Sequence, residues 1–286
     1  MPVTDALLAI DLGAESGRAV SGRFNGTRLQ LEEVLRFPNQ PVAVGETLYW
    51  DILDIFANVE AAIEKARASG GLRSVGIDTW GVDFGLLDRC GRLVANPIHY
   101  RDRRTEGMMQ RAFEIVPREE IFSATGNMFL ELNTLYQLLA LRLADDPTLE
   151  IADRMLNTPD LLHYWLSGVM AHELTIASTT QCLAANRTEW AWDLLCRLDI
   201  PARLFGDIVP PGTRLGSLRA RLWLNRPGPP QPRSPGGWRF FLEASPAPHA
   251  LSRRTQEVAP SRRSETPPIP GRPGAWRRTR RVQRRR

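Results

Sequence analysis

The sequence predicts a mixed α/β domain of layered architecture, and three observations support this class. The chain opens with three strand-like segments in close succession, an amphipathic helical segment follows them, and strand-like and helical segments alternate beyond it. This order is typical of helices packed against a sheet. The 43% apolar and 24% charged residues are ordinary values for a globular protein, and they exclude collagen-like and wholly disordered classes.

The opening strands are expected at residues 6–12, 18–24 and 28–37. Ala6–Leu12 is an apolar run that precedes Gly13, which is the pattern of a buried strand running into a turn. The dipeptide Asn25-Gly26 separates the second and third segments. It favours a tight type I′ hairpin, because both central residues of that turn need a positive φ.

A long amphipathic helix is expected next, from the N-cap Asp51 to about Ala68. Apolar residues recur along this segment at steps of three and four, and the pair Gly70-Gly71 ends it. Beyond it we expect strands at residues 74–78, 82–87 and 154–158, and helices at 105–115, 133–144 and 159–165.

The composition changes abruptly near residue 218. Residues 1–218 hold 20 basic and 29 acidic residues, whereas residues 219–286 hold 17 Arg, no Lys, three acids and 12 Pro. A segment of the second kind cannot bury enough apolar surface to offset the entropy lost on ordering its backbone. We therefore expect a folded domain over residues 5–217 and a disordered, low-complexity basic tail over residues 219–286.

Several classes of function lack their sequence signature. The three cysteines are widely spaced and form no CxxC pair, which indicates neither a disulfide framework nor a zinc site and favours a reduced, cytoplasmic compartment. No run of 18 apolar residues and no basic leader occur, so we expect neither a membrane span nor a signal peptide. The isolated His99, His163 and His172 do not predict a metal site.

The first candidate site is the glycine-bounded segment 11–18, of sequence DLGAESGR. Two glycines let the backbone turn tightly, so that successive backbone N–H groups can point at a phosphate. The residues that would bind it in this way are Ala14, Glu15, Ser16, Gly17 and Arg18. Asp11 could hold Mg²⁺ directly or through water. The segment is not a Walker A loop, because the GK[ST] ending is absent and a strand follows it. The alternative is an ordinary hairpin turn.

The second candidate site is the segment 76–84, of sequence GIDTWGVDF. It places two carboxylates and an indole around Gly81 at a strand–turn–strand junction. The face of Trp80 can stack on the C–H groups of a sugar while Asp83 accepts hydrogen bonds from its hydroxyls. The alternative is that Trp80 belongs to the core and Asp78 to a turn.

Both motifs resemble those of a known family when they are taken together with the segments that follow them. These segments are YRDRRT at residues 100–105, NTLYQLLAL at 133–141 and TIASTTQ at 175–181. In this order they resemble the N-terminal domain of the FGGY carbohydrate kinases, and the DTWGVDF form of the second motif is similar to that of the rhamnulokinase branch. The resemblance covers residues 5–217.

The resemblance implies a ribonuclease-H-like fold of the actin and hexokinase type. It also implies transfer of a phosphoryl group from ATP, with Mg²⁺, to the C1 hydroxyl of L-rhamnulose; a ketose of the fuculose or xylulose type is the alternative substrate. By residue match it assigns Ala14–Arg18 to the ATP phosphate loop, Asp11 to the surroundings of Mg²⁺, and Trp80, Gly81 and Asp83 to the sugar site. Glu15 departs from the small hydroxyl residue that the family more often has, and an acid would repel a triphosphate, so we expect its side chain to point away from the loop.

The resemblance stops before the part of the family pattern that holds the general-base Asp and the second domain, and residues 219–286 contain no Asp. We therefore expect no catalytic residue and no activity in this chain, since loss of a general base alone lowers a rate by about 10²–10⁴-fold. Arg- and Pro-rich composition is what GC-rich DNA yields in a wrong reading frame, so a frameshift in the second domain is our hypothesis for the tail. The alternative is a non-catalytic fragment whose tail binds nucleic acid without specificity. No motif indicates specific nucleic-acid binding, and the sequence does not indicate an oligomeric state.

Overall fold

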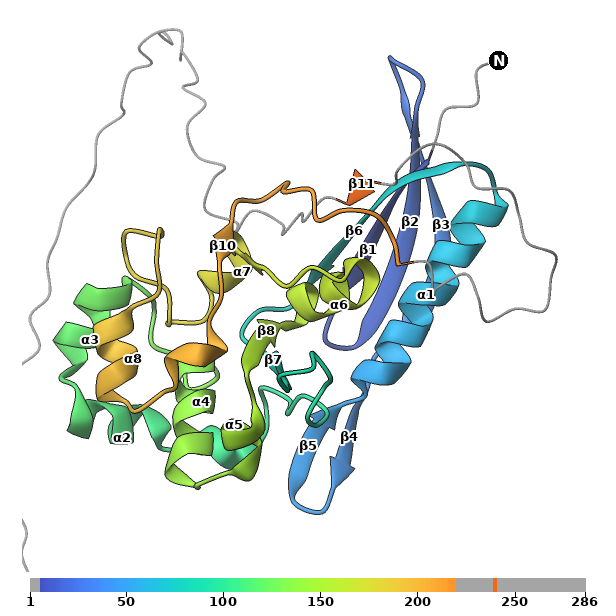
Figure 1. Cartoon of the computed structure of the whole chain (residues 1–286). Helices are drawn as coiled ribbons and strands as arrows, with labels where there is room; N and C mark the ends of the chain where they lie inside the picture. The colour runs from blue at the N-terminus through green and yellow to red at the C-terminus, as the bar shows by residue number, and fades with distance from the viewer. Residues whose placement is uncertain (1–5, 220–238, 241–286) are drawn as a thin grey trace, which may run out of the picture. The chain divides into compact units, whose positions relative to one another are not determined.

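A five-stranded sheet of order β11-β6-β1-β2-β3 carries both candidate loops (Figure 1). Its strands are β1 (Ala6–Leu12), β2 (Ser16–Phe24), β3 (Leu29–Pro38), β6 (Leu72–Thr79) and β11 (Arg239–Phe240). The first three form an antiparallel meander, whereas β6 runs parallel to β1 and β11 runs parallel to β6. The structure is a computed structural model that describes residues 6–219 and 239–240. The predicted disorder of the basic tail therefore lies almost wholly outside the described residues.

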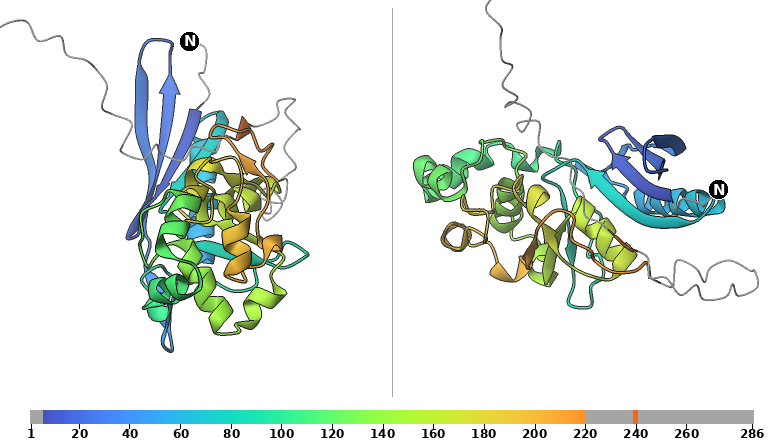
Figure 2. Two further views of the ribbon diagram at one scale, coloured as in Figure 1. Left: turned by 90° about the vertical axis from the view of Figure 1, so that its left-hand side faces the viewer. Right: turned by 90° about the horizontal axis from the view of Figure 1, so that it is seen from above.

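Helix α1 (Ile52–Ala68) covers one face of the sheet (Figures 1 and 2). Burial alternates along β1, where every second residue is buried, and those residues share one core cluster with the apolar stripe of α1. The carboxylate of Asp51 accepts a hydrogen bond from the N–H of Asp54 at 3.1 Å and caps the helix. The predicted helix, including its N-cap, is confirmed.

The turn between β2 and β3 differs from the predicted type I′ turn. Asn25 and Arg28 close the hairpin through a backbone hydrogen bond of 3.2 Å, so that Gly26 and Thr27 are its central residues. Only Gly26 has a positive φ, of 99°. The side chain of Asn25 instead accepts hydrogen bonds from the N–H groups of Thr27 and Arg28, as in an Asx-turn.

Most of the remaining helices gather away from the sheet around a second apolar cluster (Figure 1). They include α2 (Met108–Ile115), α3 (Arg118–Thr125), α4 (Thr134–Leu143) and α8 (Trp192–Arg197). The helix predicted at 105–115 is divided, because Gly107 has a φ of 77° and separates a 3₁₀ turn at Arg103–Thr105 from α2. The predicted helix at 133–144 is confirmed in α4.

Two strands and a helix connect the sheet to this second cluster. β7 (Phe84–Leu87) pairs antiparallel with β8 (Arg154–Asn157), and α6 (Thr158–Ser167) follows β8 directly. His163 of α6 accepts the backbone N–H of Ile77 in β6 through its Nε2 atom at 3.3 Å. The predicted strands at 82–87 and 154–158 and the helix at 159–165 therefore exist with bounds shifted by at most two residues.

The other elements are short and were not predicted. They are β4 (Pro41–Val44), β5 (Thr47–Trp50), α5 (Pro147–Ile151), β9 (His172–Glu173), α7 (Leu174–Ala177), a 3₁₀ turn at Ala202–Leu204, and β10 (Ile208–Val209). The mixed α/β class is confirmed. Among residues 6–219 and 239–240, no helix has both the length and the apolar character needed to cross a membrane.

Candidate functional site

The two candidate loops begin next to each other at one edge of the sheet. In the parallel pair of β1 and β6, Asp11 lies opposite Asp78 and Leu12 lies opposite Thr79. Because the carboxyl ends of parallel neighbours meet at the same edge, residues 13–15 (the Gly13 loop, which leads into β2) and residues 80–83 (the Gly81 turn) leave the sheet side by side. Two motifs about 65 residues apart in the sequence thus belong to one region of the surface.

The Gly13 loop is a tight connection braced from one side. The N–H of Gly13 donates to the carbonyl of Ser16 at 2.9 Å. Asn39, only 3% exposed, donates its side-chain amide to the carbonyl of Gly13 at 2.7 Å and its backbone N–H to the carbonyl of Glu15 at 3.0 Å. Within the described residues the N–H groups of Ala14 and Glu15 have no such partner. They remain available to an anion.

Gly17 is required by packing. A Cβ atom at this position would lie 2.3 Å from the ring of Phe37 and 2.8 Å from a methyl group of Leu12. No side chain fits there without displacing the ring, so Gly17 shapes the loop by letting Phe37 cover its backbone.

Asp11 and Arg18 face each other across β1 and β2 and form an ion pair. The two terminal atoms lie 2.6 Å apart, and both side chains are about half exposed. An exposed ion pair of this kind contributes about 0–1 kcal/mol. Both groups can therefore exchange their partner for a bound phosphate or cation at little cost. Glu15 and Ser16 are exposed beside them.

The Gly81 turn holds strained backbone. Val82 has a φ of 70°, and the N–H of Asp83 donates to the carbonyl of Gly81 at 2.9 Å, which closes a three-residue γ-turn. Such a conformation costs about 1–3 kcal/mol in a branched residue and persists only when its surroundings hold it. Here the hydroxyl of Thr134 donates to the carbonyl of Val82 at 2.6 Å, and the N–H of Val82 donates to Thr179 at 3.2 Å.

A pocket of about 450 Å³ opens at this turn, within the usual range for ligand sites. We call it the Trp80 pocket. Its lining residues come from four separated segments: Trp80, Gly81, Val82, Tyr100, Asn127, Met128, Leu130, Leu132, Asn133, Ser178 and Thr179. Two of the predicted sugar-site residues thus line it, as do parts of the polar segments 100–105 and 175–181. The latter segment overlaps helix α7 (Leu174–Ala177).

The lining of the Trp80 pocket combines aromatic and apolar faces with amide and hydroxyl groups. Among the described residues it includes no carboxylate and no histidine. It can therefore hold a neutral polyhydroxyl ligand by stacking and hydrogen bonds, but it offers no side chain that would take a proton from that ligand.

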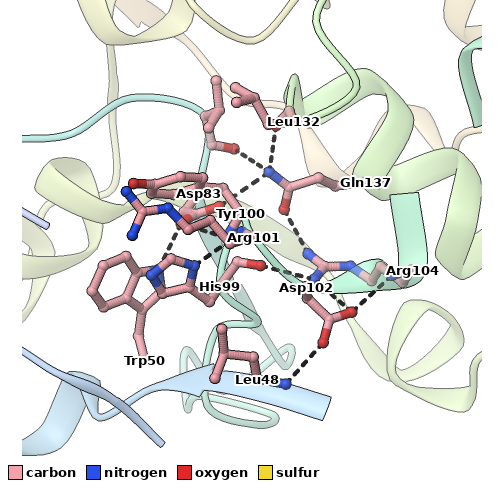
Figure 3. Close-up of polar contacts among 11 residues, drawn as sticks. Leu48, Trp50, Asp83, His99, Tyr100, Arg101, Asp102, Arg104, Leu132 and Gln137 are labelled. Atoms are coloured by element: carbon pink, nitrogen blue, oxygen red, sulfur yellow. Dashed lines mark hydrogen bonds and ion pairs between the residues drawn. The ribbon is translucent and has the colours of Figure 1, made fainter. Parts of the chain in front are cut away.

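Asp83, the third predicted sugar-site residue, is fully buried and does not line the pocket. Figure 3 shows it among its neighbours Trp50, Tyr100 and Gln137. Its carboxylate accepts hydrogen bonds from Trp50, Trp80, Tyr100 and Gln137. Burial raises the pKa of Asp83 to about 6, although the N–H donors act in the opposite direction.

Residues 127–132 are the part of the pocket that sequence reasoning missed. The segment NMFLEL lies between two helices and carries no motif, glycine loop or charge pattern that indicates a ligand. Its position follows from tertiary contacts, since the side chain of Asn127 donates to the carbonyl of Ser178 at 2.7 Å.

His99, His163 and His172 are buried. His99 stacks on Trp50 with ring centroids 4.0 Å apart, and His163 accepts the N–H of Ile77. His172 packs edge-on against Trp190 at 4.9 Å. In the part of the chain that the structure describes, no three side chains of the metal-binding types lie close enough to share an ion.

Comparison with known proteins gives consistent matches. The model of the N-terminal domain of the FGGY family of carbohydrate kinases matches residues 6–225. Rhamnulokinase of Bacteroides thetaiotaomicron is 41% identical over 211 residues, which is 73% of this chain and 44% of that protein. Rhamnulokinase of Oceanobacillus iheyensis is 39% identical over 216 residues, or 75% of this chain and 46% of that protein. The chain thus spans about half the length of the curated relatives it matches.

Solved structures agree on the fold. Xylulose kinase from Lactobacillus acidophilus superimposes with a TM-score of 0.71 at 17% identity, over 84% of this chain and 48% of that chain. Glycerol kinase from Plasmodium falciparum, solved with ADP, superimposes with a TM-score of 0.66 at 16% identity, over 77% of this chain and 46% of that chain. The predicted ribonuclease-H-like domain of the actin type is confirmed. From its sequence matches and its fold together, the chain belongs to the FGGY family of carbohydrate kinases.

Proposed function

We propose that the chain carries the sugar-binding and phosphate-binding face of an ATP-dependent rhamnulokinase. The observation that carries this proposal is the juxtaposition of the Gly13 loop and the Gly81 turn at the ends of β1 and β6. A kinase must hold a phosphate donor and an acceptor hydroxyl next to each other, because positioning supplies much of its rate enhancement. The rhamnulokinase relatives support L-rhamnulose as the acceptor.

In this proposal the Trp80 pocket holds the sugar. The indole of Trp80 and the ring of Tyr100 offer faces for C–H groups, and Asn127, Ser178 and Thr179 offer polar atoms for hydroxyls. The pocket volume of about 450 Å³ accommodates a monosaccharide with room to spare for the group it receives.

The Gly13 loop receives the phosphates of ATP. The N–H groups of Ala14 and Glu15, which have no partner among the described residues, suit phosphate oxygens, and Arg18 adds a cation once it leaves Asp11. The carboxylate of Asp11 fits Mg²⁺, because that ion is usually bound by one or two carboxylates together with substrate phosphates. When bound, Mg²⁺ would neutralise charge on the transferring phosphoryl group.

The proposed reaction forms a bond between the C1 oxygen of L-rhamnulose and the γ-phosphorus of ATP. The bond from that phosphorus to the β,γ-bridging oxygen breaks, ADP leaves, and the hydroxyl proton passes to a base. No described residue that lines the Trp80 pocket can act as that base. We therefore assign the described residues to binding and orientation.

Because the reaction consumes ATP, we propose the cytoplasm as its location, and residues 5–217 remain the proposed extent of the kinase domain.

Substitution of Gly81 tests the proposal. A Cβ atom on Gly81 would lie 2.9 Å from the hydroxyl oxygen of Thr179, inside the lining of the pocket. Gly81→Ala should abolish saturable binding of L-rhamnulose, followed by ligand-observed NMR, while far-ultraviolet circular dichroism stays unchanged. Gly22→Ala is the matched control, because its Cβ would meet nothing nearer than 3.5 Å. Retained binding in Gly81→Ala would refute the assignment of the pocket, and preferential binding of L-fuculose or D-xylulose would refute that of the sugar.

A further inference from the structure

The carboxylate of Asp83 connects residues that form the wall of the Trp80 pocket. Its Oδ2 atom accepts from the indole N–H of Trp50 at 2.6 Å and from the indole N–H of Trp80 at 3.1 Å. The same atom accepts from the backbone N–H of Tyr100 at 3.2 Å. Trp80 and Tyr100 line the pocket, whereas Asp83 is 0% exposed and cannot touch a ligand.

The indole of Trp80, which lines the pocket, stacks on the buried indole of Trp50. Trp50 is fully buried, with the ring of Trp80 3.9 Å away and the ring of His99 4.0 Å away. Stacking alone lets a ring slide or rotate in its own plane. The N–H is the one polar group of each indole, so donation by Trp50 and Trp80 to a single oxygen fixes that remaining freedom.

The second oxygen of Asp83 is held by an amide that cannot turn around. The side-chain NH₂ of Gln137 donates to Oδ1 of Asp83 at 3.0 Å and to the carbonyl of Leu132 at 2.7 Å. The carbonyl oxygen of the same amide accepts from Arg104 at 2.6 Å. If the amide flipped, its NH₂ would face the guanidinium, so Asp83 always meets donors on both oxygens.

We propose that Asp83 is a positioning residue, whose carboxylate sets the orientation of Trp80 and Tyr100 as the aromatic wall of the sugar site. The inference rests on the proposed function, because it takes the Trp80 pocket to be that site. A carboxylate is needed because it only accepts hydrogen bonds. In Asp83→Asn the NH₂ of the new side chain would face at least one of the four N–H donors. Two donors cannot bond to each other, so both would be left unpaired in a buried place.

The same geometry makes the wall sensitive to pH. A proton on either oxygen of Asp83 removes an acceptor from one of its donors, and burial raises the pKa of Asp83 to about 6. The other charged or titratable side chains that face the cluster are His99, Arg101, Asp102 and Arg104. Of these only His99 has an ordinary pKa near 6, and burial lowers its pKa to about 4.

Circular dichroism of the full chain tests the orientation without any ligand. Two indoles stacked at 3.9 Å couple their transitions and give a paired band in the far ultraviolet, which Trp80→Phe should remove. Asp83→Asn should lose most of this band. Asp88→Asn should keep it, because Asp88 also accepts backbone N–H groups, at 2.8 and 2.9 Å, but lies at the other end of β7. In the unsubstituted chain the band should weaken between pH 8 and pH 5, with a midpoint near pH 6.

Titration with L-rhamnulose provides the second measurement. Asp83→Asn should weaken its binding about five- to tenfold at pH 7.5, the effect of losing one net hydrogen bond, and should remove the pH dependence. An unchanged band and unchanged affinity in Asp83→Asn would overturn the proposal. If that variant does not fold, a band in the unsubstituted chain that is constant from pH 8 to pH 5 would overturn it. A band that titrates near pH 6 without any L-rhamnulose binding would support the positioning role and refute the proposed substrate.

Discussion

Replacement of His172 by Phe should make the protein less sensitive to acid. His172 is 1% exposed, packs edge-on against Trp190, and within the described residues neither ring nitrogen has a hydrogen-bond partner. Burial, with a smaller effect from the charge of Arg154, lowers the pKa of His172 from its ordinary 6.5 to about 3. The folded protein therefore keeps this ring neutral where the unfolded chain protonates it.

The sign and size of the effect follow from this difference in pKa. Above pH 6.5 the ring is neutral in both states and the free energy of unfolding does not depend on it. Between pH 6.5 and pH 3 the unfolded state binds one more proton, so stability falls as the pH falls. From pH 7.5 to pH 5 the unsubstituted protein should lose about 2 kcal/mol through this group alone.

Urea denaturation at pH 7.5, 6.5 and 5 measures this contribution as a difference between two proteins. Phe has a similar shape, keeps the contact with Trp190 and brings no unpaired nitrogen into the core, so His172→Phe should be at least as stable at pH 7.5 and relatively more stable at pH 5. His163→Phe should show a similar gain at pH 5 but lower stability throughout, because it leaves the N–H of Ile77 without its acceptor. A difference between His172→Phe and the unsubstituted protein that is constant with pH would refute the reasoning.

Two further predictions concern the Gly13 loop and turnover. Gly17→Ala should destabilise the domain by about 1–3 kcal/mol, because its Cβ would overlap the ring of Phe37. Urea denaturation measures this loss, and an unchanged midpoint of unfolding would show that the ring can move aside. The 286-residue chain, assayed with ATP, Mg²⁺ and L-rhamnulose, should release no ADP beyond a control without sugar, because no base lines its pocket among the described residues. Turnover above about 1 s⁻¹ that Asp11→Asn abolishes would contradict this prediction.

The sequence predicts those parts of the fold whose pattern is local. Helix α1 has a long apolar stripe, an N-cap and a terminating glycine pair, so its bounds follow from residues 51–71 alone. The hairpin of β4 and β5 has no such pattern, because all four residues of β4 are exposed. Trp50 ends β5 as a buried residue that stacks with Trp80 and His99, and these contacts cannot be deduced from neighbours in the sequence.

The same distinction applies to the candidate site. Trp80 and Gly81 belong to a compact motif and are predicted, and they line the pocket. Asp83 belongs to the same motif, yet its burial depends on Trp50 and Gln137, which lie 33 and 54 residues away. Residue type identifies a carboxylate near a turn, but only tertiary structure decides whether it faces a ligand or the residues behind it.

In the proposed function the Gly13 loop and the Trp80 pocket form a single site for phosphoryl transfer. Paramagnetic relaxation tests it, with Mn²⁺ and ADP bound in place of Mg²⁺ and ATP while the ¹H signals of L-rhamnulose are observed. We predict that the protons on C1 relax faster than the methyl protons, and that Asp11→Asn suppresses the effect without changing sugar affinity. Equal relaxation of both groups, or none when the sugar and the nucleotide are both bound, would contradict the claim.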